Sequence, residues 1–203
     1  MKKILFLISM LLLLNVSLFS QGLSIFVHSG YTFGDRFPVY GGTGKIYDGH
    51  TYGGAINYEI SDFYAFEIAY SRQDSRVTAV SSSLLQAIDE PLSSNYILGG
   101  VNRQLKVSDE ATLFGGLKLG AVIYSTSGSR FDAVTRFAVG LNAGAKYMFA
   151  EKIGLRIQAN LNSPVTDIGS SLWWSPGSGV SVGVSSYTPI LQFGFTGGLV
   201  FQL

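Results

Sequence analysis

Two segments that alternate strictly between hydrophobic and other residues flank a short turn at residues 150–152. The hydrophobic positions are Phe137, Val139, Leu141, Ala143, Ala145 and Tyr147, followed by Ile153, Leu155, Ile157, Ala159 and Leu161. Small residues, amides and cations occupy the positions between them. Because a period of two residues is the signature of a β-strand, residues 136–162 are predicted to form a hairpin. Its strands are long enough to cross a bilayer.

The same alternation recurs along most of the chain and predicts further strands at 23–33, 51–60, 64–71, 113–124 and 191–203. Residues 95–105 have the composition of a strand, but hydrophobic residues fall on both faces, so their orientation is left open. With the hairpin, these segments make eight strands. Short connections lie at 61–63, 107–110 and 150–152, and long ones at 35–50, 73–94, 125–132 and 163–189.

The long connections are predicted to be loops. The one at 35–50 contains Pro38 and four glycines. Residues 73–94 are polar, with flanks that are expected to extend the neighbouring strands and a possible helical turn at 83–88. An even-stranded meander with short turns at one end and long loops at the other is typical of a transmembrane β-barrel.

The N-terminus has the pattern of a secretory signal peptide. Two lysines follow Met1, and the chain is then mostly hydrophobic from Ile4 to Phe19. This stretch is shorter than the ~20 apolar residues of a membrane-spanning helix. Cleavage is predicted after Ser20, which divides the chain into a signal peptide at 1–20 and a barrel domain at 21–203.

Composition agrees with a membrane barrel. Charged residues are 13% of the chain, against about 25% in a typical soluble domain. Past the signal there is no run of 18 hydrophobic residues, which excludes helical membrane spans. No basic stripe suggests nucleic-acid binding, and the absence of cysteine leaves no disulfide to stabilise an exported chain.

The placement of charge decides which face of the strands is outside. A soluble barrel would turn its hydrophobic face inward and would need charge on the outer face. Here the other face is mostly Gly, Ala, Asn and Gln with a few isolated charges. Lysine or arginine on a lipid-facing midplane costs about 2–4 kcal/mol, so these charges are assigned to the lumen. Predicted interfacial aromatic residues are Tyr31, Phe33, Tyr64, Phe66, Tyr70 and Tyr147.

The whole chain after residue 20 resembles the small eight-stranded outer-membrane barrels of the OmpA, OmpX and OmpW type. Its C-terminus is similar to the terminal signal that such proteins present to the barrel-assembly machinery, with Thr196, Gly198, Phe201 and Leu203 at the matching positions. A final Leu replaces the Phe of many members. The resemblance implies an all-β, eight-stranded antiparallel up-and-down transmembrane barrel in the outer membrane. No peptidoglycan-binding segment follows Leu203, so the anchoring role of larger members is not implied.

Six charged residues are predicted to form a polar network in the lumen: Glu59, Glu67, Lys118, Arg136, Lys146 and Arg156. Their parity places them on the inner face of the barrel. They could form a gate for small solutes or a buried salt-bridge network, and the network is favoured because an unpaired buried charge is costly.

Catalytic and cofactor chemistry has little support. His28 and His50, with Ser29 and Glu59, could suggest hydrolysis, and lipid A deacylases and proteases exist on this architecture. The chain lacks the His-x-Ser motif that these enzymes carry on a late strand. No histidine pair or cysteine has metal-ligand spacing, and the glycines at 41–44 with Lys45 lack the context of a phosphate loop. We expect no enzyme activity, metal or cofactor.

Trp173 and Trp174, followed by the alternating residues Val180, Val182 and Val184, are the most unusual exposed feature. They could bind an extracellular protein, glycan or lipid headgroup. They could equally pack on an extension of the strands or lie at the membrane interface. The favoured function is a structural or surface-interacting outer-membrane protein. The alternatives are a narrow channel for small or hydrophobic solutes and, third, an enzyme acting on outer-membrane lipid.

Overall fold

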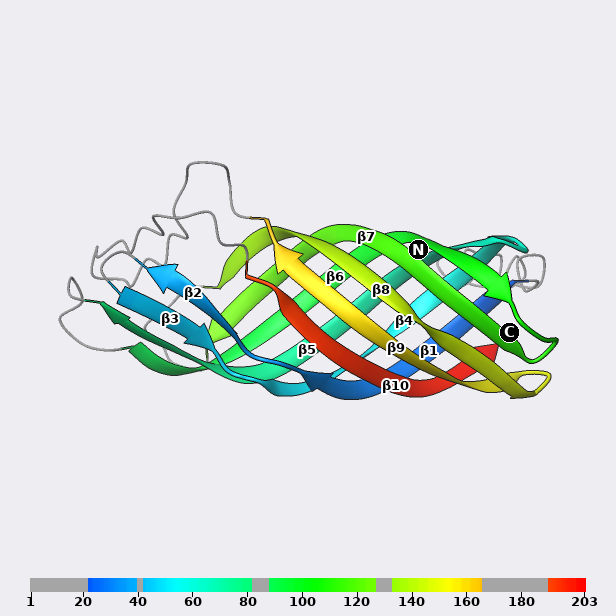
Figure 1. Cartoon of the computed structure of the whole chain (residues 1–203), viewed down its shortest axis with the longest axis horizontal. Coiled ribbons are helices and arrows are strands. Elements are labelled where there is room, and N and C mark those ends of the chain that lie inside the picture. Colours follow the sequence, from blue (N-terminus) through cyan, green and yellow to red (C-terminus); the bar gives the residue numbers. More distant parts are fainter. Residues whose placement is uncertain (1–21, 40–41, 82–87, 127–132, 166–189) are drawn as a thin grey trace, which may run out of the picture.

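The computed structural model describes residues 22–39, 42–81, 88–126, 133–165 and 190–203. Eight strands form one closed barrel (Figure 1). They are β1 (Leu23–Thr32), β4 (Gly49–Ser61), β5 (Tyr64–Ser81), β6 (Ile88–Lys106), β7 (Ala111–Thr126), β8 (Val134–Ala150), β9 (Ile153–Pro164) and β10 (Gln192–Gln202). Each pairs antiparallel with the strand that precedes and follows it in this order, and β1 pairs with β10 to close the wall. The predicted eight-stranded up-and-down barrel is confirmed.

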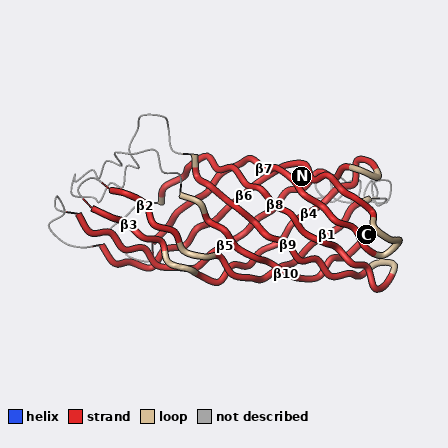
Figure 2. The backbone as a smooth tube through the Cα atoms, viewed as in Figure 1, coloured by secondary structure: helices blue, strands red, loops and turns tan. Residues whose placement is uncertain are grey.

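The two ends of the barrel differ as the sequence predicts. Turns 62–63, 107–110 and 151–152 lie at one end together with the C-terminus (Figure 2). We call this the short-turn end and the opposite one the long-loop end. The flanks of the 73–94 segment extend β5 and β6 to 18 and 19 residues, as expected. The helical turn predicted at 83–88 falls largely outside the described residues, and Ile88 begins β6.

The prediction of a loop at 35–50 is wrong for much of its length. Strands β2 (Asp35–Val39) and β3 (Gly42–Ile46) form a hairpin, and β3 pairs with the extension of β5 at residues 77–81 (Figure 1). Ile46 is buried in the interior at the long-loop end, and Phe37 packs on the same apolar cluster. The glycines of this segment obscure the alternation of hydrophobic and polar residues in the sequence. Burial of the Ile46 and Phe37 side chains favours the pairing of these strands.

The strand whose orientation the sequence left open is β6. Ile97 and Val101 point outward, and Tyr96, Leu98 and Asn102 point inward. The two faces look alike in sequence because the lumen is not polar throughout. At the long-loop end it contains an apolar cluster with the members Ile46, Val77, Leu92, Tyr96, Leu98, Val122, Tyr124, Ala138 and Ile190.

The outer wall carries a continuous belt of exposed large hydrophobic residues. Side chains such as Ile56, Leu117 and Leu141 are about half exposed although they lie in the middle of their strands. All six predicted interfacial aromatic residues are exposed on this surface as well. An apolar surface of this extent marks contact with a membrane. No helix among the described residues is long and apolar enough to span a membrane.

Two adjacent glycines on β10, where this strand pairs with β1, differ in the space available for a side chain. They therefore provide a test of how tightly this part of the wall is packed. A Cβ atom on Gly198 would lie 1.9 Å from the Val27 carbonyl oxygen, so the backbone would have to shift. A Cβ atom on Gly197 would meet Ile157 at 3.4 Å, an ordinary contact. Gly198→Ala is therefore expected to lower the free energy of unfolding by about 1–3 kcal/mol, and Gly197→Ala by much less.

Refolding into detergent, followed by urea unfolding, measures both glycine variants without any assembly machinery. Equal stability of the two variants would contradict the packing account. Normal refolding of Gly198→Ala with failed assembly in cells would instead assign Gly198 to the assembly signal.

Candidate functional site

Glu67 on β5 is the centre of a polar site inside the barrel and is fully buried. Its Oε1 forms an ion pair with Lys118 Nζ from β7, and its Oε2 lies 2.7 Å from Arg156 Nη2 on β9. Asn102 on β6 donates its Nδ2–H to Oε2 at 3.1 Å. We call Glu67, Lys118 and Arg156 the central ion cluster, which joins strands on opposite sides of the lumen.

Arg156 is held from several directions. Its Nη1 donates to Asn57 Oδ1 at 3.2 Å. The guanidinium carbon lies 4.7 Å from the ring centroid of Phe26 and 4.1 Å from that of Phe114. Cation–π contacts of this kind stabilise a desolvated guanidinium by about 2 kcal/mol. The cluster is therefore fixed by aromatic packing as well as by charge.

A second ion pair lies nearer the short-turn end, where Lys146 Nζ is 3.1 Å from Glu59 Oε1. The two side chains are 15% and 33% exposed, so this pair is more solvated than the central ion cluster. Arg136 is the exception among the six charged residues that the sequence assigned to the lumen. It takes part in none of the ion pairs of the described residues, and its Nη1 donates to the Thr135 carbonyl at 3.3 Å.

Sequence reasoning missed the uncharged partners in this site. Asn57 and Asn102 orient the cluster, and Asn142 donates its Nδ2–H to Asn102 Oδ1 at 3.0 Å. Phe26 and Phe114 provide the aromatic faces. All five share one feature of the sequence, since they occupy the alternate positions of their strands that face the lumen.

Two small cavities lie on either side of the central ion cluster, and no residue lines both. The upper chamber, toward the long-loop end, has a volume of about 40 Å³ and is lined by Lys118, His28 and several amides. The lower chamber, toward the short-turn end, has a volume of about 20 Å³ and is lined by Arg156 and the Lys146–Glu59 pair. The cluster therefore separates the two chambers.

A second set of side chains crosses the lumen nearer the long-loop end. Tyr96 donates its hydroxyl to Gln192 Oε1 at 2.5 Å, and Gln192 Nε2 donates to Gln73 Oε1 at 2.9 Å. All three side chains are buried, and Tyr96 belongs to the apolar cluster. The lumen is thus bridged by side chains at two levels.

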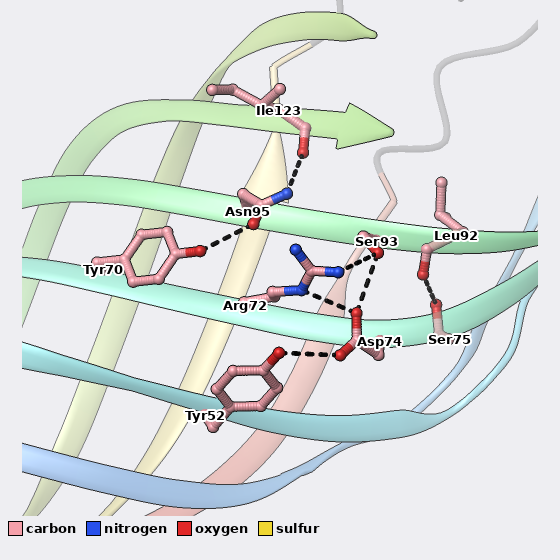
Figure 3. A network of polar contacts seen from close by, with 9 residues as sticks. All are labelled: Tyr52, Tyr70, Arg72, Asp74, Ser75, Leu92, Ser93, Asn95 and Ile123. Carbon is pink, nitrogen blue, oxygen red and sulfur yellow. Dashed lines mark hydrogen bonds and ion pairs between the residues drawn. The ribbon is translucent and has the colours of Figure 1, made fainter. Parts of the chain in front are cut away.

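A different polar network lies on the outer wall near the long-loop end (Figure 3). Asp74 accepts hydrogen bonds from Tyr52 Oη at 3.1 Å, Arg72 Nε at 2.9 Å and Ser93 Oγ at 3.0 Å. Tyr70 donates to Asn95 Oδ1 on the next strand at 2.9 Å. Tyrosines with their hydroxyls turned to polar partners are typical of the membrane–water boundary.

Because its side chains are exposed, the outer network is expected to contribute little to the free energy of unfolding. The Arg72 and Asp74 side chains are 38% and 47% exposed, and exposed ion pairs contribute about 0–1 kcal/mol. Asp74→Asn is therefore expected to change the free energy of unfolding by less than about 1 kcal/mol. Urea unfolding of the refolded variant measures this, and a loss as large as that of a buried ion pair would contradict it.

The residues considered for hydrolysis do not come together. Ser29 Oγ lies 2.7 Å from His50 Nε2 on the outer wall, whereas His28 is buried in the lumen and Glu59 lies toward the short-turn end. No carboxylate among the described residues hydrogen-bonds to His50. The described residues contain no cluster of three or more His, Cys, Asp or Glu side chains that could hold a metal ion.

The remaining predicted site residues lie at the C-terminus and in the last long connection. Thr196 on β10 points into the lumen and accepts a hydrogen bond from Asn160 Nδ2 at 3.0 Å, whereas Phe201 and Leu203 are exposed on the outer wall. Trp173 and Trp174 fall outside the described residues.

Comparisons with known proteins agree with this architecture. The crystal structure of neisserial surface protein A is similar with a TM-score of 0.61 and 14% identity, over 90% of this chain and 97% of that one. The outer membrane protein OprG from Pseudomonas aeruginosa is similar with a TM-score of 0.59 and 12% identity, over 88% and 95% of the two chains. At these identities the likeness shows the fold alone.

Comparison with curated protein sequences finds no match. The family model for the outer membrane protein beta-barrel domain matches residues 14–187, which is most of the chain. The chain therefore belongs to this family of β-barrel proteins, and its location is the outer membrane.

Proposed function

We propose that this protein is a structural or surface-interacting barrel whose closed lumen makes it a rigid scaffold for its loops. In outer-membrane barrels the short turns face the periplasm and the long loops face the outside. The observation that carries the proposal is the central ion cluster, in which Glu67 is shared by Lys118 and Arg156 between two separate chambers.

Energy and volume both support a scaffold over a narrow channel. Separating one partner from a buried ion pair costs about 3–5 kcal/mol, so a path through the cluster is closed at equilibrium. Chambers of about 40 and 20 Å³ hold only a few water molecules, since each needs roughly 10–15 Å³. The Tyr96–Gln192–Gln73 bridge adds a second closure.

A liposome-swelling assay tests the closed lumen. Refolded protein is incorporated into liposomes, which are then exposed to monosaccharides and small amino acids, with a general porin as positive control. The expected swelling rate equals that of empty liposomes at every protein density. A rate that rises with the amount of barrel would favour the channel.

The surface-interacting role is assigned to the connection that contains Trp173 and Trp174. The double variant Trp173→Ala/Trp174→Ala is compared with the unchanged protein on whole cells, using immobilised glycans, proteins and lipid vesicles as probes. Heat-modifiable mobility on gels controls for folding. Preserved mobility with unchanged binding would reject these tryptophans as contact residues.

The sequence of the terminal strand supports recognition of this protein by the barrel-assembly machinery. Thr196, Gly198, Phe201 and Leu203 give β10 the pattern of an assembly signal, and this strand closes the barrel against β1. We expect truncation of the last residues to reduce assembly in cells more strongly than refolding into detergent.

Hydrolysis of membrane lipid is the alternative that the Ser29–His50 contact keeps open. A serine nucleophile needs a base that is itself oriented by a third group, and no described carboxylate bonds to His50. We therefore expect identical lipid profiles from cells that carry the unchanged protein, Ser29→Ala or no protein. A lipid change that depends on Ser29 would establish an enzyme.

A further inference from the structure

The hairpin of β2 and β3 carries two basic side chains on its outward face. Arg36 and Lys45 are directly opposite each other in the register of the two strands. Their neighbours Phe37 and Ile46 pack in the interior at the long-loop end, so the alternation of a strand turns Arg36 and Lys45 outward. Opposite positions of an antiparallel pair bring the Cβ atoms to about 4.5–5.5 Å. Two positive charges therefore share one small area of the surface.

Neither charge is compensated within the described part of the chain. None of the ion pairs of the described residues contains Arg36 or Lys45. The carboxylates closest to them in sequence bind other groups, because Asp35 accepts backbone N–H groups and Asp48 accepts the Tyr31 hydroxyl. Like charges at directly opposite positions destabilise a strand pair. An anion that contacts both side chains would remove this repulsion.

The neighbouring strand β5 continues the same surface. Lys45 is opposite Thr78, so Arg36, Lys45 and Thr78 form a row across three strands. Arg76 lies two residues before Thr78 on the same face, and its Nη1 is 2.9 Å from Asp89 Oδ1. We call Arg36, Lys45 and Arg76 the outer basic cluster. Asp89 balances one of its three positive charges, and the other two remain.

The outer basic cluster lies just beyond the lipid-facing wall (Figure 1). Tyr31 and Tyr52, whose hydroxyls bind carboxylates, mark the edge of the hydrophobic belt at the long-loop end. Arg36 follows Tyr31 by five residues, which is roughly 12 Å farther out along a strand tilted by about 40°. The headgroup layer is roughly 5–8 Å thick, and long basic side chains reach back toward it.

Protection of an exposed strand edge does not explain both cations. Among the described strands β2 pairs only with β3, and a charge on such an edge strand discourages pairing with another chain. Arg36 on β2 serves that purpose alone. Lys45 belongs to β3, which is paired on both sides. Its position opposite Arg36 therefore points to recognition of an anion.

We propose that Arg36 and Lys45 bind a phosphate group of a lipid headgroup in the outer leaflet, with Arg76 at the margin of the same site. A guanidinium donates two parallel N–H bonds to phosphate oxygens, and an ammonium adds a compact positive charge. The phosphate compensates both cations and joins the projecting hairpin to the membrane surface. This role concerns the outside of the wall and does not depend on a closed lumen.

The binding test is native mass spectrometry of the refolded protein in a neutral detergent. Lipid A with two phosphates is the probe, and the same lipid after removal of both phosphates is the comparison. The unchanged protein is expected to retain the phosphorylated lipid preferentially. Equal retention of the two lipids would overturn the proposal, since acyl chains alone would then account for binding.

Two double variants remove equal charge from opposite ends of the barrel. Arg36→Gln/Lys45→Gln is expected to weaken binding of phosphorylated lipid A roughly 25-fold, because each basic side chain near an anionic surface contributes about fivefold. Arg103→Gln/Lys152→Gln changes exposed positions near the short-turn end and is expected to leave binding nearly unchanged. Heat-modifiable mobility on gels checks the folding of both. Equal weakening by the two variants would show general attraction and overturn the site.

Dextran sulfate tests the alternative that the cluster binds a soluble polyanion. It is added to the unchanged protein and to Arg36→Gln/Lys45→Gln in the same detergent. Binding of dextran sulfate that requires Arg36 and Lys45, while both proteins bind lipid A equally, would overturn the assignment to a membrane lipid.

Hydrogen–deuterium exchange of the unchanged protein does not depend on the folding of any variant. Phosphorylated lipid A is expected to slow exchange of the β2 and β3 amides, and the dephosphorylated lipid is not. Arg36→Gln removes the repulsion with Lys45, so it is expected to slow this exchange in detergent without lipid, whereas loss of a structural contact would speed it. Exchange in β2 and β3 that does not respond to phosphorylated lipid A would overturn the proposal.

Discussion

Glu67→Gln is expected to lower the free energy of unfolding by about 3–5 kcal/mol, the usual cost of leaving a buried charge without its partner. The reason is that Glu67 is the only carboxylate that contacts Lys118 or Arg156 in the ion pairs of the described residues. Glutamine keeps the size of the side chain and removes the charge. Lys118 and Arg156 would then repel each other in the closed centre of the barrel.

Urea unfolding of the protein in lipid vesicles measures this loss, with Glu59→Gln as the matched control. Glu59 also pairs with a lysine, but its side chain is 33% exposed where that of Glu67 is 1% exposed. Water therefore solvates the ions of the control, and a loss below about 1 kcal/mol is expected there. Equal losses for the two variants would mean that burial of the central ion cluster has no energetic consequence.

Leu141→Arg is expected to destabilise the barrel by about 2–4 kcal/mol, the cost of a cation on a lipid-facing midplane. Leu141 lies midway along β8 between the exposed aromatic residues Phe137 and Tyr147, and about half of it is exposed. Its neighbours on the adjacent strands, Leu117 and Leu161, are hydrophobic. The same urea experiment measures the effect.

A substitution at a different depth controls for the general effect of arginine. Leu105 is exposed near the short-turn end of β6, two residues beyond the outward-facing Arg103. Leu105→Arg is expected to cost only about 0–1 kcal/mol, because the side chain reaches the membrane interface. A small loss at Leu141 together with a large one at Leu105 would contradict the assigned membrane position.

Most of the wall could be predicted from alternation alone. In residues 136–162 one face of each strand contacts lipid and the other faces the lumen, so the alternation of hydrophobic residues fits only one arrangement of the strands. The hairpin at Asp35–Val39 and Gly42–Ile46 could not be predicted in this way. It lies on the extension of β5 beyond the barrel, where Ile46 is buried by neighbours that are distant in sequence.

The candidate site could be predicted only as a set of inward-facing charges. Parity identifies Glu67 and Arg156 as lumen residues, but partner choice depends on the register and tilt of strands on opposite sides of the barrel. Arg136 shares the parity of Lys146 on the same strand, yet it takes part in none of the described ion pairs. Strands on opposite sides of the lumen are not hydrogen-bonded to each other, so the sequence pattern does not show which of their side chains are in contact.

Single-channel recording of the refolded protein in planar bilayers tests the closed lumen most directly. The unchanged protein is expected to give no conductance steps in chloride salts, because the central ion cluster separates the two chambers. Stable, voltage-independent steps whose frequency follows the amount of folded barrel would contradict the account.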